Sequence, residues 1–220
     1  DQTAVRRLNQ LTGPFILRRM KADVLKELPP KTENVYRIEL EEEQRKLYLA
    51  AVVDAREKLR AAKPEDKMAV FAVLMRLREI CCDPRLIADN WEGGSAKLDA
   101  CVELISGAVE GGHRILLFSQ FTSMLELLAK RLDEAGVSHF TLQGSTPKPV
   151  RAELVRRFNS GEVDVFLISL RAGGTGLNLT AADIVIHYDP WWNVAAQNQA
   201  TDRAYRIGQR NPVQVYKLIA

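Results

Sequence analysis

Short apolar runs that alternate with helical patterns constrain the fold of this chain more than any other feature of its sequence. The runs that have the character of strands lie at residues 115–118, 139–142, 164–169, 184–187 and 213–219. Apolar residues at steps of three and four mark helices, as at Leu125, Leu128 and Leu132. Residues 115–118 are apolar at every position, which is typical of a strand buried on both faces. The alternation predicts an α/β fold in which a parallel sheet is flanked by helices on both faces.

The first 90 residues have a different organisation. One strand is predicted at 33–40, and helical repeats follow at 47–59 and 68–82. We expect this part to be a small helical module, bordered by Glu92-Gly93-Gly94. The sequence therefore predicts two units, a helical subdomain at 1–94 and a sheet-containing unit at 95–220.

Composition excludes several classes of protein. The 220 residues are 46% apolar and 27% charged, as in globular domains rather than disordered or fibrous chains. No apolar run approaches the ~18 residues that span a bilayer, and the start is polar, so we expect no membrane segment and no secretory signal. Three cysteines are too few for a disulfide framework, which favours a reducing, intracellular environment. The net charge of +3 is a weak hint of an anionic partner, since a solvated basic face is the commoner explanation.

Two features predict that the chain is part of a larger protein. It stops inside an apolar strand, at residues 215–220, with no terminal helix or polar tail. It also lacks a G-x-x-x-x-G-K-[ST] loop, the usual cradle for nucleotide phosphates. We therefore expect any nucleotide chemistry to need residues from elsewhere.

Polar and glycine-rich segments follow the predicted strands. Ligands of open α/β sheets bind outside the carboxyl ends of the strands, so these segments form a candidate site. They lie at residues 119–121, 143–146, 169–178 and 188–193. Their small hydroxyls, amides and glycines offer unobstructed donors to phosphates. The glycines Gly173, Gly174 and Gly176 suit an anion-binding nest, and a flexible loop with a tight turn is the alternative.

A helix is predicted after Trp192, with Asn193 as its cap. Its polar positions that share one face are Gln199, Asp202, Arg203 and Arg206. Its apolar positions, expected against the sheet, are Ala196, Ala200, Ala204 and Ile207. Two arginines one turn apart present forked donors that suit phosphate oxygens. A solvated polar face with an Asp202–Arg206 ion pair is an equally open interpretation.

Seven collinear blocks carry a family resemblance. They are residues 17–21, 28–31, 77–87, 117–121, 172–179, 189–193 and 202–209, the last being Asp-Arg-Ala-Tyr-Arg-Ile-Gly-Gln. Together they resemble the Swi/Snf-type chromatin-remodelling ATPases, a branch of the superfamily-two helicases. The last block is similar to motif VI, residues 117–121 to motif IV and residues 172–179 to motif V. The first three resemble the inter-lobe connector and the inserted helical segment, so the resemblance spans nearly the whole chain.

The chain departs from the family's blocks at three positions. Val194 stands where proline is frequent, and Tyr205 and Asp83 stand where histidine is frequent. None of these differences replaces a charged residue or a glycine of the motifs, so they affect the expected loop geometry more than the family resemblance. Tyr205 and the short insertion favour a bacterial or archaeal source, hence a cytoplasmic, nucleoid location. A eukaryotic source would imply the nucleus.

The resemblance implies the second of two RecA-like lobes, with ATP at the seam between them. Arg203 and Arg206 would then be arginine fingers that reach phosphates held by the first lobe. The other residues implied at the nucleotide seam are Gln199, Asp202, Gly174 and Gly176. Mg2+ would be bound mainly by the nucleotide and the absent lobe, and the three histidines have no metal-ligand spacing.

The resemblance also implies that the protein holds the backbone of double-stranded DNA. The candidate contacts are Ser119, Gln120, Gly144, Ser145, Ser169, Arg171, Gly173, Asn178 and Trp192. Few of these side chains suit base edges, so binding should be largely independent of sequence and sensitive to salt. The expected partners are duplex DNA, the first lobe and a DNA-bound protein as cargo, with no membrane.

These expectations describe a DNA-dependent ATPase, with this chain as one lobe of an ATP-driven translocase that remodels protein–DNA complexes. The chain alone should be inactive. Alternatives are a strand-separating helicase, an ATPase that acts on RNA polymerase, or a nucleotide-inactive module that binds DNA or protein. The pair Arg203 and Arg206 argues against the last, since such a module needs no seam arginines.

Overall fold

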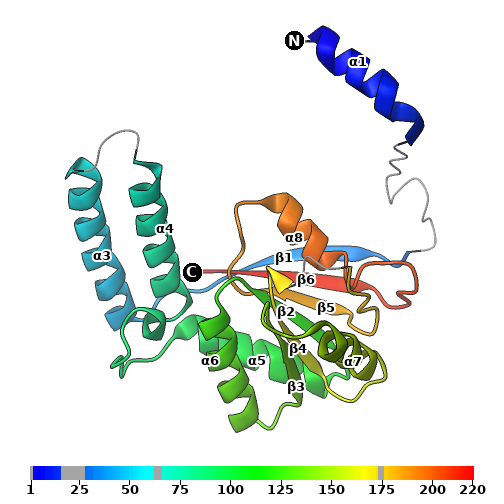
Figure 1. Cartoon of the computed structure of the whole chain (residues 1–220). Coiled ribbons are helices and arrows are strands. Elements are labelled where there is room, and N and C mark those ends of the chain that lie inside the picture. Colours follow the sequence, from blue (N-terminus) through cyan, green and yellow to red (C-terminus); the bar gives the residue numbers. More distant parts are fainter. Residues whose placement is uncertain (1, 16–27, 62–65, 173–175) are drawn as a thin grey trace.

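Six parallel strands form one sheet in the computed structural model, which describes residues 2–15, 28–61, 66–172 and 176–220 (Figure 1). The strands are β1 (Lys31–Arg37), β2 (Ile115–Ser119), β3 (His139–Leu142), β4 (Val165–Ser169), β5 (Ile184–His187) and β6 (Val213–Ile219). Their order across the sheet is β1-β6-β5-β2-β4-β3, and every neighbouring pair is parallel. The predicted parallel α/β sheet is confirmed.

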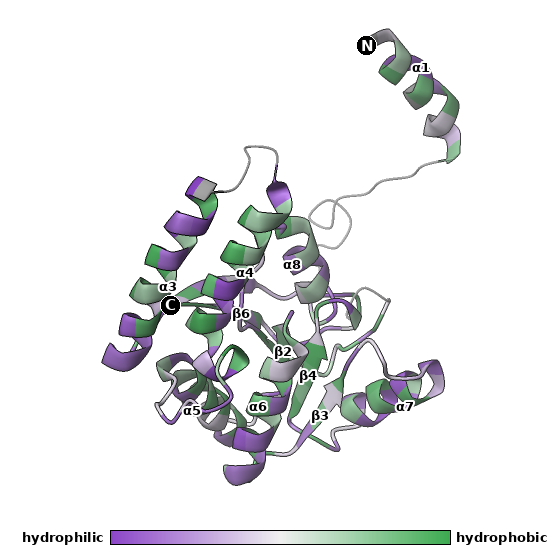
Figure 2. Cartoon of the chain, turned by 60° about the vertical axis from the view of Figure 1, so that its left-hand side comes forward, coloured by the Kyte–Doolittle hydropathy of each residue, from purple (hydrophilic) through white to green (hydrophobic). Residues whose placement is uncertain are grey.

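Helices cover both faces of the sheet. On one face α5 (Ala96–Glu110) and α6 (Thr122–Glu134) pack against side chains such as Leu117 and Ile186. On the other face, α7 (Lys148–Asn159) and α8 (Val194–Thr201) belong to a second core cluster, which includes Leu116 and Phe166 of the sheet. Every residue of β2, β4 and β5 is buried. The apolar strands β2 and β4 between polar-faced helices are visible in Figure 2. This core rigidly positions the loops at the carboxyl ends of the strands.

The N-terminal side of the chain contributes further helices. They are α1 (Gln2–Thr12), η1 (Gly13–Phe15), α3 (Glu42–Ala61), α4 (Lys67–Cys82) and η2 (Pro84–Leu86). The helices α3 and α4 stand side by side next to the sheet (Figure 1). The edge strand β1 also precedes residue 94, so the sheet draws on both predicted units. The border at residue 94 stays a prediction about domain organisation.

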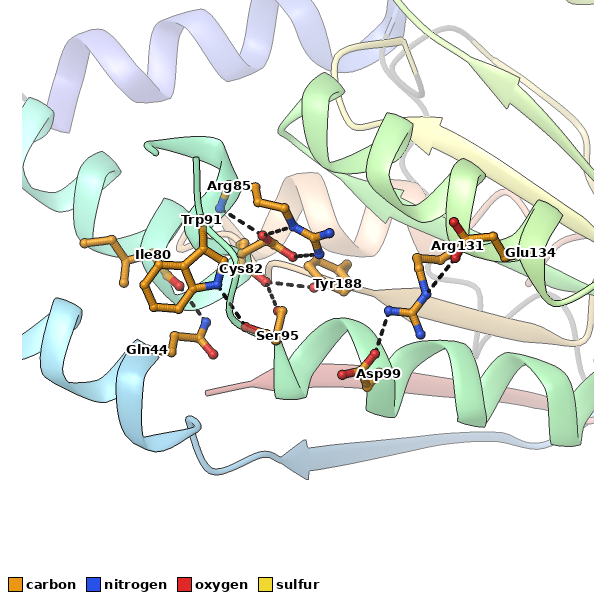
Figure 3. A network of polar contacts seen from close by, with 12 residues as sticks. Gln44, Ile80, Cys82, Arg85, Trp91, Ser95, Asp99, Arg131, Glu134 and Tyr188 are labelled. Carbon is orange, nitrogen blue, oxygen red and sulfur yellow. Dashed lines mark hydrogen bonds and ion pairs between the residues drawn. The ribbon is translucent and has the colours of Figure 1, made fainter. Parts of the chain in front are cut away.

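Hydrogen bonds to main-chain carbonyls attach the end of α4 to the sheet (Figure 3). The carbonyl of Cys82 accepts the hydroxyl of Tyr188 at 2.9 Å and that of Ser95 at 3.1 Å. Gln44 of α3 donates to the carbonyl of Ile80 at 2.8 Å. Because these groups are buried, their bonds are costly to break. The end of α4 is thereby fixed against the strand-end segment that follows β5.

The helix predicted through Arg206 is shorter than expected. It ends at Thr201, whose hydroxyl lies 2.9 Å from the Nε2 atom of buried His187 in β5. Residues 202–206 then follow in turns, so the predicted common face of Gln199, Asp202, Arg203 and Arg206 does not form. Ile207, expected against the sheet, is 69% exposed. The helix is therefore shorter than its periodicity predicts.

Two smaller features complete the fold. The residue at the N-cap of α7 is Pro147, and the Thr146 hydroxyl accepts the amide of Gln143 at 3.1 Å. All three cysteines are free, with Cys82 and Cys101 buried. Within the described residues, no helix has both the length and the apolar character needed to cross a membrane.

Candidate functional site

A groove of about 810 Å³ lies at the carboxyl ends of β2, β3 and β4. The sequence-predicted residues that line it are Gln120, Gly144, Ser145, Ser169 and Arg171. Helix α4 contributes Phe71, Met75 and Glu79. Residues from three separate loops thus meet in one place, as the parallel arrangement requires.

Polar candidates and the exposed Phe71 of α4 both face this groove. Gly144, Ser145 and Arg171 are exposed, and Gln120 is half-buried. Behind them, Arg151 of α7 donates to the carbonyls of Thr146 and Ala172, each at 3.3 Å. Arg151 thereby ties the loop after β3 to the loop after β4. This residue was not predicted from the sequence, because it lies in a helix rather than at a strand end.

Ser119 and Ser169 differ from the other candidates, because both are buried. The hydroxyl of Ser119 accepts the amide of Phe121 at 3.2 Å, and that of Ser169 accepts the amide of Ala172 at 3.2 Å. These hydroxyls are used to shape the turns after β2 and β4. We therefore assign these hydroxyls to positioning the loops, and their predicted contact with a ligand stays a prediction.

Two tryptophans stack at one end of the groove. The ring centroids of Trp191 and Trp192 are 3.8 Å apart, and Phe71 meets Trp192 edge to face. Trp192 is 54% exposed and Trp191 is half-buried. The exposure of Trp192 is compatible with its predicted contact to a ligand, which stays a prediction.

Asp189 is a buried acid behind the same loops, with 4% exposure. Burial raises the pKa of its carboxyl to about 6, although the Ser119 hydroxyl and the Gln120 amide oppose this shift. The carboxylate accepts the Gln120 amide at 3.1 and 3.3 Å. In the sequence this residue belongs to a motif, but its type and position alone predicted no role for it.

The seam candidates lie after α8. Arg203 is only 5% exposed, and its Nε atom is buried without a hydrogen-bond partner. Burial, followed by the charge of Arg206, lowers the pKa of the Arg203 guanidinium. Among the residues that the structure describes, no side chain forms an ion pair with Arg203. This buried cation therefore favours a nearby anion.

Arg203 also lies next to the glycine-rich loop. Its carbonyl accepts the amide of Leu179 at 3.0 Å. Gly176 has a φ of +40°, a backbone conformation that residues other than glycine rarely adopt. Gly173 and Gly174 lie outside the described residues, so their predicted roles stay predictions.

The remaining candidates are more open. Gln199, Arg206 and Asn178 are exposed, and Asp202 is half-buried. The amide group of Asn159 donates to the Asn178 carbonyl at 2.8 Å, which fixes the loop but leaves the Asn178 side chain outward. Within the described part of the chain, no group of three acidic, histidine or cysteine side chains is placed to hold a metal ion.

Comparison with known proteins gives this geometry a family. Residues 96–208 match the Helicase conserved C-terminal domain, and residues 1–86 match the SNF2-related domain. An uncharacterized ATP-dependent helicase of Mycoplasma pneumoniae is 41% identical over 97% of this chain, which corresponds to 21% of that protein. The mouse SWI/SNF-related matrix-associated actin-dependent regulator of chromatin subfamily A member 1 is 39% identical over 100% of this chain and 22% of its own. The chain thus spans about a fifth of the length of these relatives.

Solved structures agree with these matches. The Sulfolobus solfataricus SWI2/SNF2 ATPase core domain is 33% identical over 100% of this chain and 46% of its own, with a TM-score of 0.75. The same core in complex with dsDNA gives 31% identity, a TM-score of 0.75 and coverage of 100% and 47%. The sheet order and flanking helices match the RecA-like fold of these cores. This chain belongs to the helicase conserved C-terminal domain family, as a C-terminal lobe of the Swi/Snf type within the superfamily-two helicases.

Proposed function

We propose that this chain is the second lobe of an ATP-dependent translocase on double-stranded DNA, and that its groove holds the DNA backbone. The observation that carries the proposal is the meeting of Gln120, Gly144, Ser145 and Arg171 around one groove. They supply main-chain amides, small polar groups and a guanidinium, and these groups can donate hydrogen bonds to phosphate oxygens. A similar core, 31% identical over the whole of this chain, has been solved with dsDNA.

The chemistry of the groove favours recognition of the backbone rather than of bases. Arg171 provides an exposed charge, while the glycine and serine of the loop after β3 leave room for a sugar-phosphate chain. Asn178 and Trp192 are further proposed contacts at the same side of the sheet. Because phosphates carry no sequence information, affinity should be similar for duplexes of any sequence and should fall with salt.

We also propose that Arg203 and Arg206 act at a nucleotide seam. The buried Arg203 fits such a group, since its Nε atom lacks a partner and its charge has no ion pair among the described residues. ATP, when bound, supplies the phosphoanhydride bond whose hydrolysis drives movement. Arg203 and Arg206 would bind phosphate oxygens and stabilise the charge that spreads over them. Gln199, Asp202, Gly174 and Gly176 are proposed to line the same seam, with Mg2+ and most nucleotide contacts supplied by the first lobe.

The whole protein would use this cycle to remodel protein–DNA complexes without separating strands. Its cargo would be a DNA-bound protein, and its location the compartment that holds the DNA. The test is ATP turnover by the full-length protein with and without duplex DNA. We expect duplex to stimulate turnover and the 220-residue chain alone to be inactive. Equal turnover with and without duplex would contradict the proposal.

The groove is tested by Arg171→Ala in the full-length protein. We expect duplex affinity to fall by roughly fivefold for every sequence tried, because one phosphate contact is lost. Fluorescence anisotropy of labelled duplexes measures this. Arg156→Ala is the matched control, since it removes an exposed arginine whose partner is Glu153 of the same helix. A loss confined to some sequences would argue against backbone binding.

A further inference from the structure

Arg78 of α4 holds the segment after β5 through two kinds of contact. Its Nη2 atom donates to the carbonyls of Asp189 and Pro190, each at 3.2 Å. Its guanidinium carbon lies 4.7 Å from the ring centroid of Trp191 and 5.2 Å from that of Trp192. A planar guanidinium can form hydrogen bonds and also lie over aromatic rings, which an ammonium cannot match. Arg78 therefore fixes the carbonyls and the indoles together.

The same side chain reaches the groove through Asp189. The carboxylate of Asp189 lies 3.6 Å from Arg78 Nη2 and accepts the main-chain amide of Gln120. Gln120 is the first residue after β2 and lines the groove. Its side chain also reaches α4, where Nε2 lies 3.7 Å from the sulfur of Met75. A continuous set of contacts thus joins α4 to the loop after β2.

We propose that Arg78 is a positioning residue for the groove. It fixes the stacked pair Trp191 and Trp192 and, through Asp189, the amide of Gln120. The helices α3 and α4 are thereby coupled to the groove, and a shift of this pair alters the groove directly. The consequence for DNA affinity rests on the proposed function, whereas the ordering of the two loops does not.

Arg85 provides a matched control in the same segment. It also pairs with a buried aspartate, because its Nε and Nη2 atoms donate to the Asp83 carboxylate at 2.8 and 2.6 Å (Figure 3). Neither Arg85 nor Asp83 lines the groove. A general loss of stability should affect Arg78→Gln and Arg85→Gln alike, so a difference between them isolates positioning.

The experiment compares Arg78→Gln, Arg78→Lys and Arg85→Gln in the full-length protein. Amide hydrogen exchange is followed in peptides that contain Gln120 and residues 188–194, and duplex affinity is measured in parallel. For Arg78→Gln we expect roughly tenfold faster exchange in both peptides and roughly fivefold weaker binding. Arg78→Lys should fold with near-normal stability, because a cation still faces Asp189, but its loops should exchange as fast as those of Arg78→Gln. Arg85→Gln should leave both readouts unchanged.

The outcomes separate this proposal from the proposed function. Wild-type exchange at Gln120 in both Arg78 variants would overturn the positioning role, as would an equal rise in Arg85→Gln. Faster exchange with unchanged duplex affinity would support positioning and count against the groove as the DNA site. If Arg171→Ala weakens binding while the Arg78 variants leave exchange and affinity unchanged, the groove stands and the role of Arg78 falls.

Discussion

The arginines around the groove and those at the seam have opposite surroundings. Arg78 and Arg151 donate to main-chain carbonyls of their own lobe, and each joins two separate segments. Arg203 is more deeply buried, and among the described residues its guanidinium forms neither a hydrogen bond nor an ion pair, whereas Arg78 and Arg151 each leave one buried nitrogen, Nη1 and Nε respectively, without a partner. Leaving a buried guanidinium without partners costs free energy, so the site of Arg203 favours a group from outside the lobe. We infer from this difference that the groove is largely preformed, whereas the proposed seam would be completed by another surface.

The largest expected effect lies at the seam. Arg206→Ala in the full-length protein should lower duplex-stimulated ATP turnover by roughly 100-fold or more, because a guanidinium that stabilises the phosphoryl charge is lost. Steady-state kinetics at saturating duplex measures this. Arg210→Ala is the control, since Arg210 is an exposed arginine of the following loop. Unchanged turnover in Arg206→Ala would remove the contrast between seam and groove.

A smaller effect tests whether the groove is preformed. The pKa of Asp189 is raised to about 6 in the folded state, from 3.8. Between these values the folded state binds more protons than the unfolded state, so the stability contributed by Asp189 falls as pH rises from about 4 to about 6. Relative to Asp189→Asn, the wild type should therefore lose unfolding free energy over that window, by up to about 1.4 kcal/mol per pH unit.

Urea denaturation of both proteins at several pH values measures this difference. A difference that stays constant from pH 4 to pH 6 would mean that the buried carboxyl titrates normally. In that case the hydrogen bonds from Gln120 and Ser119 fully offset the effect of burial, and the groove loops are held more firmly than we infer.

The smallest effect is expected where an arginine serves neither region. Arg156 pairs with Glu153 on the surface of α7, and both side chains are at least half exposed. Because exposed ion pairs contribute little, Arg156→Ala should leave both the unfolding free energy and the ATP turnover nearly unchanged. Thermal unfolding and ATPase assays check this. A large loss of stability or turnover in Arg156→Ala would show that the removal of charge alone, rather than the position of the arginine, explains the effects of the other variants.

Much of the fold was predictable from local sequence. Strands buried on both faces require apolar residues throughout, so β2 was expected at 115–118 and lies at Ile115–Ser119. Glycine is typical of the position after a helix end, and Gly136, with a φ of +69°, follows α6. The groove followed from the same reasoning, because parallel strands bring their carboxyl ends to one edge.

What the sequence could not predict depends on contacts that only the fold reveals. The helix α8 ends at Thr201, beside the buried His187, and no periodicity reveals this contact. Sequence alone also does not show that the hydroxyls of Ser119 and Ser169 accept amides of their own turns. Arg78 lies 111 residues before the carbonyl of Asp189 that it binds, so its role needed the fold.

The most direct test of the central claim is the salt dependence of duplex binding by the full-length protein. If Arg171 contacts a phosphate, the plot of log affinity against log salt should become shallower by about 1 in Arg171→Ala. Arg156→Ala should keep the wild-type slope, although it removes the same charge. Equal slopes for the wild type and Arg171→Ala would contradict the account, because the groove would then hold no phosphate at that arginine.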